Sequence, residues 1–235
     1  AKSGKNGKSP IDLISKYNAD ILRLWAISSD SLHDVKFSDA AMDTHKETFR
    51  KIRNTLRYVE SVAAKSHTNA KRFHCFDDID NYIISKLDET IQKAHDALEE
   101  MSLPKYVAVI KEFCISDLSQ FYLEARKDVL YCGTEDERLN IGVCMSIIYN
   151  NLCALCYPIM PFAVTEFKRS KSPSIVLSIP KGISKPKEDW SKIRSFRHKV
   201  NSMLEQHGGN KLELSIVVPS EYVAPYFVYG VSQVL

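Results

Sequence analysis

The sequence lacks the features of a membrane or secreted protein. None of its 235 residues falls in a run of 18 consecutive apolar residues, whereas a membrane-spanning helix needs about 20. Its first residues carry charges with no hydrophobic segment behind them, so we expect no secretory signal. Apolar residues make up 44% of the chain and charged residues 26%, which is typical of a soluble globular protein.

Cysteine spacings that bind zinc are also missing. Cys153-Ala-Leu-Cys156 is the only Cys-x-x-Cys, whereas a zinc site needs a second pair or two histidines. No histidine lies between Cys132 and Cys156, and the surrounding residues are apolar, so the cysteines suit small hydrophobic positions in a core. We therefore expect reduced thiols, no bound metal and a cytoplasmic protein.

A complete phosphate-binding loop is absent as well. Residues 4–9, GKNGKS, end like such a loop, but the motif needs a glycine where Lys2 stands and a strand before it. Pro10 directly follows Ser9, which suits Ser9 as an N-cap and Pro10 as the first residue of a helix. No Ser/His/Asp set stands out among the seven scattered histidines. The residues alone therefore indicate no catalytic site.

Charge is present in alternating blocks. Residues 45–72 hold eight Lys/Arg and two acids, residues 73–101 hold eight acids and two lysines, and residues 168–199 hold ten Lys/Arg and two acids. The net charges of the two basic blocks are therefore +6 and +8. Such blocks favour a basic face for a polyanion beside an acidic face, and a merely solvated surface explains them equally well.

Helical periodicity covers about two thirds of the chain. It predicts helices over about 10–25, 38–65, 76–101, 102–121 and 135–157, with Ser9, Ser38 and Ser102 at N-cap positions. Short connections between helices predict an antiparallel helical bundle, so the fold class is mainly α.

The predicted helix 38–65 has two distinct faces. Its apolar face comprises Phe49, Ile52, Leu56, Val59 and Ala63. About 100° round the helix lies a cationic face that we expect to point outward, comprising Lys46, Arg50, Arg53 and Arg57. Together with Lys71 and Arg72 in the following segment, this face is the candidate contact surface for nucleic-acid phosphates.

From Ser174 onward the pattern changes to a small mixed α/β unit. SIVLSI at 174–179 is typical of a strand, 187–206 of an amphipathic helix, and 211–218 of a half-buried strand after a Gly-Gly turn. A last strand is expected at 228–235.

Several longer segments closely resemble isoleucyl-tRNA synthetases from their KMSKS loop onward. The matching segments are SPIDLISKYNADILRLWAISSD, DVKFSD, TFRKIRNTLRYV, LDETI, DLSQFYLEARKDVLYC, YPIMPFAVTEF, SIVLSIP and VYGVSQVL, which span nearly the whole chain. ADILRLW discriminates best, because valyl and leucyl relatives usually have other residues around its Ala-Asp and Leu-Arg. Among the departures from the family pattern, Asn18 stands where glycine is usual.

The resemblance implies a division into three parts. Residues 1–72 would hold the remnant of the KMSKS loop and the helices that contact the tRNA stem. Residues 73–170 would be the anticodon-binding helical bundle, and residues 171–235 an α/β junction unit. Lys2 and Ser3 would match the end of the KMSKS loop and stabilise charge on the ATP phosphates.

The function implied is that of the tRNA-binding part of isoleucine-tRNA ligase, which attaches isoleucine to its tRNA. The full-length enzyme would use ATP with magnesium, and its catalytic and editing domains would belong to the same polypeptide. The fragment alone would bind isoleucine tRNA, hold no cofactor, contact no membrane and be inactive as a catalyst. The alternatives are the same part of a valyl- or leucyl-tRNA synthetase, and a helical protein-interaction scaffold with no nucleic-acid role.

Overall fold

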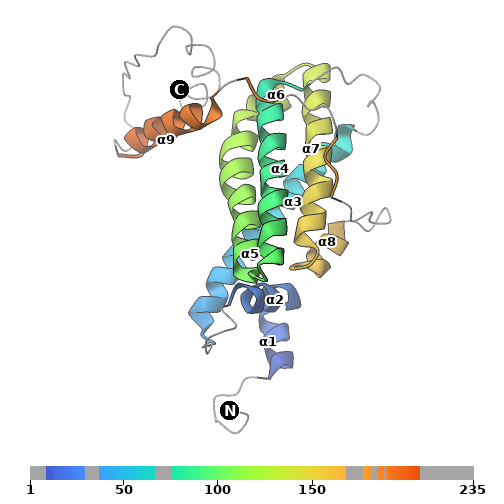
Figure 1. Cartoon of the computed structure of the whole chain (residues 1–235), viewed down its shortest axis with the longest axis vertical. Coiled ribbons are helices and arrows are strands. Elements are labelled where there is room, and N and C mark those ends of the chain that lie inside the picture. The colour runs from blue at the N-terminus through green and yellow to red at the C-terminus, as the bar shows by residue number, and fades with distance from the viewer. Residues whose placement is uncertain are drawn as a thin grey trace.

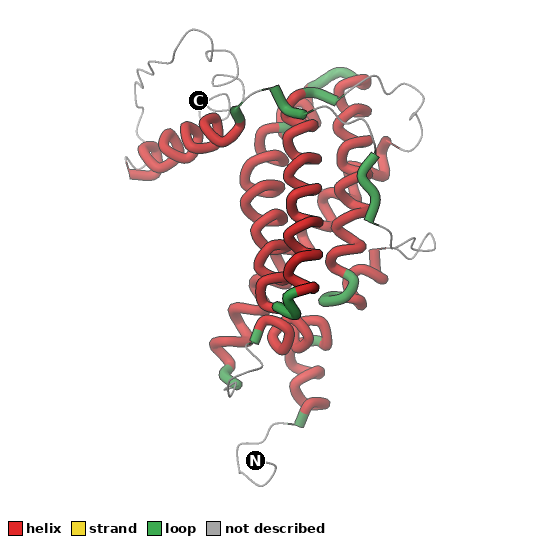
Figure 2. The backbone as a smooth tube through the Cα atoms, viewed as in Figure 1, coloured by secondary structure: helices red, strands yellow, loops and turns green. Residues whose placement is uncertain are grey.

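The structure, a computed structural model, describes residues 9–29, 37–66, 76–167, 177–180, 185–187 and 189–206. Within these ranges the chain forms helices joined by loops and contains no strand (Figure 2). The helices are α1 (Pro10–Tyr17), α2 (Ala19–Ser28), α3 (Asp39–Ser66), α4 (Asp78–Glu99), α5 (Leu103–Glu112), the π-helix η2 (Phe113–Leu123), α6 (Lys127–Cys132), α7 (Glu135–Cys156), α8 (Pro161–Phe167) and α9 (Trp190–Gln206).

Four long segments form the predicted helical bundle. α3 packs along α7, while α4 packs along both α5 and η2, which follow one another without a break. Figure 1 shows α1 and α2 at one end of this bundle and α9 at the opposite end, extending outward at an angle. One continuous core of buried apolar residues joins the bundle helices. The predicted bundle is therefore confirmed for the described residues.

The predicted helix starts agree with the structure. The Ser9 and Ser38 hydroxyls accept hydrogen bonds from the backbone N–H groups of Ile11 and Ala41. Such caps satisfy donors that have no partner within the helix. Ser102 stands at the N-cap of α5 as predicted, but its side chain makes no capping bond.

The predicted first helix is broken at Asn18. Asn18 ends α1 and begins α2 with φ 78° and ψ 147°, a conformation that glycine adopts without strain. Its side-chain oxygen accepts from Asp20 N at 3.0 Å, so an asparagine here combines the backbone turn with an N-cap. Ile11 and Ile14 of α1 are exposed rather than part of the core.

The helix predicted over 102–121 changes its hydrogen-bonding pattern midway. From Phe113 to Leu123 it is a π-helix, in which each hydrogen bond spans one residue more than in an α-helix. Side chains accompany this wide turn: the Ser119 hydroxyl donates to the Cys114 carbonyl at 2.8 Å and lies 2.9 Å from Thr55 Oγ1 of α3. Apolar periodicity alone does not predict the π-helix.

The described residues include only part of the predicted α/β unit. Its helix is confirmed as α9. Residues 177–179, the described part of the first predicted strand, are irregular, and the Asn151 amide bonds both backbone groups of Ser178, at 2.9 Å and 2.8 Å. A side chain thus replaces the strand partner that these groups would need. The strands predicted at 211–218 and 228–235 lie outside the described residues.

Candidate nucleic-acid interface

The four cations predicted on the 38–65 helix lie along one side of α3. Their spacing of i, i+4, i+7 and i+11 keeps them on one stripe, separate from the buried Ile52, Leu56 and Val59. We call Lys46, Arg50, Arg53 and Arg57 the α3 basic stripe. Lys46, Arg50 and Arg57 are exposed, whereas Arg53 is half-buried.

Arg53 differs from the other three cations because it is partly buried and paired with an acid of α8. Its Nη2 donates to both carboxylate oxygens of Glu166 at 2.9 Å and 3.0 Å, and its guanidinium lies 5.5 Å from the centre of the Phe167 ring. Arg53 is therefore only partly exposed, and its charge is already paired with an acid of the chain. Its side chain joins α3 to α8.

A buried aspartate positions α8 for this contact. The Asp20 carboxylate of α2 accepts hydrogen bonds from Ala163 N at 2.7 Å and Phe162 N at 3.3 Å, at the start of α8. Burial raises the pKa of Asp20, and these two backbone bonds oppose that rise. Asp20 thereby holds α8 against the bundle and places Glu166 beside Arg53.

The remaining cations of α3 differ in how they are paired. Arg50 forms an ion pair with Glu47 at 2.8 Å, and this guanidinium lowers the pKa of the Glu47 carboxyl. Lys46, Arg57 and the neighbouring Lys51 form no ion pair with any residue that the structure describes. These three exposed cations are the ones most available to phosphate groups.

A groove lies beside the α3 basic stripe, between α3 and η2. Its volume is about 450 Å³ and its lining is mostly apolar. Lys51, Asn54 and Tyr58 of α3 form one wall, and Ile115 and Gln120 of η2 belong to the other. We call this the α3–η2 groove.

An aromatic pair lies near one end of the α3–η2 groove. Burial raises the pKa of Tyr58, and the charge and hydrogen bond of the neighbouring Tyr131 of α6 add to that rise. Tyr131 itself is 68% exposed. An exposed aromatic ring offers a stacking surface for an unpaired base.

The acidic block at 73–101 is only partly a surface feature. Asp80 is fully buried, where it accepts from the Tyr122 hydroxyl at 2.7 Å and pairs with Arg126 at 2.8 Å. Burial raises the pKa of Asp80, and the Arg126 guanidinium limits that rise. Asp78 accepts from Trp190 Nε1 at 2.9 Å and so holds the start of α9. The expectation of an acidic face is therefore wrong for these two acids, which hold the fold together.

The second basic block is likewise partly used in packing. Arg194 of α9 forms an ion pair with Asp117 of η2 and donates to the Tyr82 hydroxyl at 3.0 Å. Trp190 stacks on Tyr82 with ring centres 5.4 Å apart. Arg197 is buried, and Glu124 opposes the fall in its pKa that burial causes. The net charge of this block therefore overstates the charge that α9 presents to a ligand.

The residues proposed from other segments lie outside the described residues. These are Lys2, Ser3, Lys71 and Arg72. Their assigned contacts with ATP phosphates and tRNA stay predictions, as do the tRNA contacts of the α3 basic stripe.

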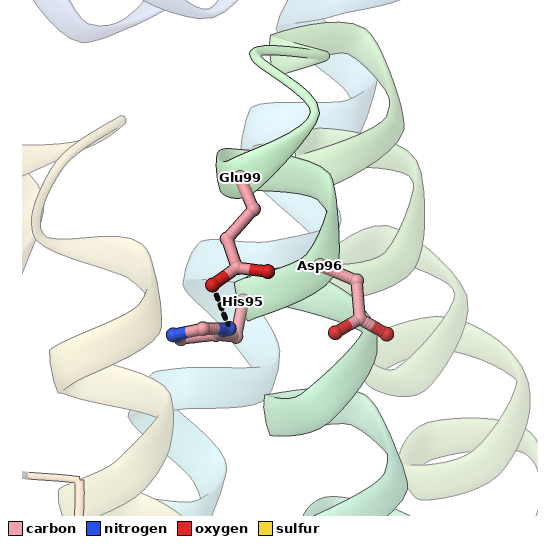
Figure 3. A group of neighbouring side chains, drawn as sticks. All are labelled: His95, Asp96 and Glu99. Atoms are coloured by element: carbon pink, nitrogen blue, oxygen red, sulfur yellow. Dashed lines mark ion pairs between the residues drawn. The ribbon is translucent and has the colours of Figure 1, made fainter.

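Possible metal ligands are few in the described part of the chain. Cys153 and Cys156 are fully buried in α7, as the packing role predicts, and burial raises the pKa of the Cys156 thiol. The one group of three candidate ligand side chains found in the described residues lies on the exposed side of α4 (Figure 3). There His95 Nδ1 lies 3.7 Å from Glu99, while Asp96 accepts from Gln92 at 3.0 Å. This arrangement is that of a surface i, i+4 pair with its own partners.

α7 is long and apolar enough to span a membrane by length and composition alone. However, 67% of its most apolar stretch is buried inside the bundle, as expected for the core helix of a globular fold.

Comparison with known proteins identifies relatives of this chain. Residues 80–212 match the family model described as the anticodon-binding domain of tRNA ligase. The isoleucine-tRNA ligase of Caldicellulosiruptor bescii is 31% identical over 230 residues, which cover 90% of this chain and 25% of the relative. Those of Natranaerobius thermophilus and Lactococcus lactis are 32% and 30% identical over 91% and 95% of the chain. The chain thus spans about a quarter of the length of the curated relatives it matches.

Proposed function

Because the chain belongs to the family of anticodon-binding domains of tRNA ligases, we propose that it is the tRNA-binding part of an isoleucine-tRNA ligase. The observation that carries this proposal is its similarity to isoleucine-tRNA ligases over about 90% of its length. The partner proposed is isoleucine tRNA, and the full-length protein would act in the cytoplasm.

The bundle would hold the tRNA mainly through its phosphates. Lys46, Lys51 and Arg57 form no ion pair with described residues and lie on one long helix, where they would neutralise successive phosphates. Arg50 could join them by exchanging Glu47 for a phosphate, because its present ion pair is exposed to water and therefore weak. Arg53 would act indirectly, by holding α8 beside the stripe.

The chemistry of aminoacylation would belong to the full-length protein. There, ATP with magnesium would activate isoleucine, and Lys2 and Ser3 would contact the ATP phosphates. The present chain would contribute binding and orientation of the tRNA and would be catalytically inactive alone. Isoleucine-dependent exchange of pyrophosphate into ATP by the isolated chain would contradict this division of roles.

The salt dependence of tRNA binding tests the phosphate contacts. Removing one cation that binds a phosphate should flatten the slope of log K against log salt by about 0.7 to 0.9, so the Lys46→Ala/Arg57→Ala variant should flatten it by about one to two units. The matched control is Lys93→Ala/Lys105→Ala, which removes the same charge from α4 and α5, in front of α3 in Figure 1. Its slope should stay close to that of the wild type.

A protein-interaction scaffold remains the second candidate, because two cations of the α3 basic stripe are already paired with acids of the chain. Equal slopes for the wild type and both double variants would count against tRNA binding by α3, whereas the absence of tRNA binding by the wild type would favour the scaffold.

A further inference from the structure

The α3–η2 groove has a different chemical character from the α3 basic stripe beside it. The stripe offers charge alone, whereas the groove combines an apolar floor with amide groups at its rim. Ile115 and Leu123 supply apolar surface, and Asn54 and Gln120 supply one amide from each wall. Phosphate binding requires no such combination, so we expect the groove to bind a different chemical group of the ligand.

The two amides are available to a ligand. Asn54 and Gln120 are both exposed, and neither side chain makes a hydrogen bond to a described residue. Each amide carries both a carbonyl acceptor and an NH₂ donor. Asparagine and glutamine can therefore bond a nucleobase edge in a bidentate manner, which neither lysine nor serine reproduces.

The wide turn of η2 gives the groove its second wall. Because a π-helix places more residues in each turn, Ile115, Ser119 and Gln120, at i, i+4 and i+5, come to the same side. The Ser119 hydroxyl is held by Thr55 Oγ1 at 2.9 Å and by the Cys114 carbonyl at 2.8 Å, so this part of the lining is already hydrogen-bonded. Recognition is thereby left to the amides at the rim and to the apolar surface.

Asn54 lines the α3–η2 groove and also lies next to the α3 basic stripe. On α3, Asn54 follows Arg50 by four residues and precedes Arg57 by three, so all three side chains are neighbours on the helix surface. Lys51 adds a fourth exposed group on the groove wall itself. A nucleotide whose phosphates lie on the stripe would thus find an amide edge and an apolar slot within about one helical turn of 5.4 Å.

We propose that the α3–η2 groove binds one unpaired base of the bound tRNA, with Asn54 and Gln120 bonding its edge and Ile115 and Leu123 contacting its face. The proposal rests on the proposed function, because it takes tRNA as the ligand. A base in a duplex cannot enter, since its edge is already paired and its faces are stacked; a splayed base from a loop or bulge can. Tyr58 also lines the groove, but its hydroxyl is already hydrogen-bonded with Tyr131.

Chemical probing of the tRNA in the complex tests this site. The ligand is an isoleucine tRNA transcript, whose unpaired bases are modified at their pairing edges with and without protein. The test variant is Asn54→Ala/Gln120→Ala, and the matched control is Gln92→Ala, an exposed amide on α4 away from the groove. Circular dichroism and thermal unfolding check each fold, and the single variants replace the double if it does not fold.

The wild type and the Gln92 variant should protect at least one unpaired base that becomes reactive again with the groove variant. That variant should bind about tenfold more weakly, as expected when a bidentate hydrogen bond is removed, with an unchanged salt slope because every phosphate-binding cation is kept. A groove variant with wild-type affinity and protection would overturn the base site and leave the proposed function intact. If instead the wild type binds no tRNA, the proposed function and the base site both fail.

Discussion

Replacing Arg126 by methionine should destabilise the bundle strongly. The arginine side chain is 5% exposed and bonds both Asp80, which is fully buried, and Asp77, which is half-exposed. Methionine fills a similar volume but leaves the Asp80 carboxylate in the core without its counter-charge. Breaking a buried ion pair on one side costs about 3–5 kcal/mol of unfolding free energy.

Two features of the site place the expected cost at the lower end of that range. Asp80 keeps the hydrogen bond from the Tyr122 hydroxyl at 2.7 Å, and its raised pKa means that it can accept a proton once Arg126 is gone. Both effects limit the loss, so we expect about 3 kcal/mol at pH 7. When folding raises the pKa of an acid, the contribution of that acid to stability is fully present at pH values below its ordinary pKa. This contribution is lost as the pH rises through the folded-state pKa. The Arg126 variant should therefore lose less stability at pH 5 than at pH 7.

Urea unfolding followed by far-ultraviolet circular dichroism measures these losses, with the wild type and Asp80→Asn in parallel. The Asp80 variant leaves Arg126 with Asp77 and should cost only about 1–2 kcal/mol. The double variant buries neither charge and should recover most of the loss, because removing both partners of a buried pair is often nearly neutral. The reasoning is refuted if Arg126→Met costs under about 1 kcal/mol, or if its cost is the same at pH 5 and pH 7.

Three further predictions concern local features of the chain. Asn18→Gly should stabilise by about 1 kcal/mol, because φ is 78° there, whereas Asn18→Ala should destabilise by about as much; the opposite order of their melting temperatures would contradict the strain argument. Met101, at φ 54° just after the C-cap residue Glu100 of α4, should gain about 1 kcal/mol as glycine, and a lower melting temperature would contradict the strain argument. Elemental analysis should find no stoichiometric zinc, since Cys153 and Cys156 are buried packing residues; one tightly held zinc per chain would overturn that.

Features set by local sequence are predictable. Ser9 and Ser38 cap their helices because a hydroxyl one residue before a helix bonds a nearby N–H, whatever the rest of the chain does. The apolar and cationic faces of α3 follow from helical spacing alone. The junction between α1 and α2 is only partly predictable. The sequence shows Asn18 where the family usually has glycine, and the positive φ of Asn18 gives the physical reason for glycine there.

Features set by distant partners are not predictable from periodicity. Arg53 and Glu166 are 113 residues apart in sequence, so charge counting does not predict that Arg53 is paired. Asp80 resembles an acid that merely favours the start of a helix, and its partner Arg126 lies 46 residues away. In both cases the partner is supplied by the packing of helices, which the one-dimensional pattern does not contain.

The measurement that tests the account most directly is a filter-binding titration of the chain with unmodified isoleucine and valine tRNA transcripts at several salt concentrations. The account predicts a salt-dependent affinity that is about tenfold or more higher for isoleucine tRNA, because base contacts add selectivity to phosphate contacts. Equal affinity for the two tRNAs would contradict the isoleucine assignment. Binding that is absent, or unaffected by salt, would contradict tRNA recognition by this chain.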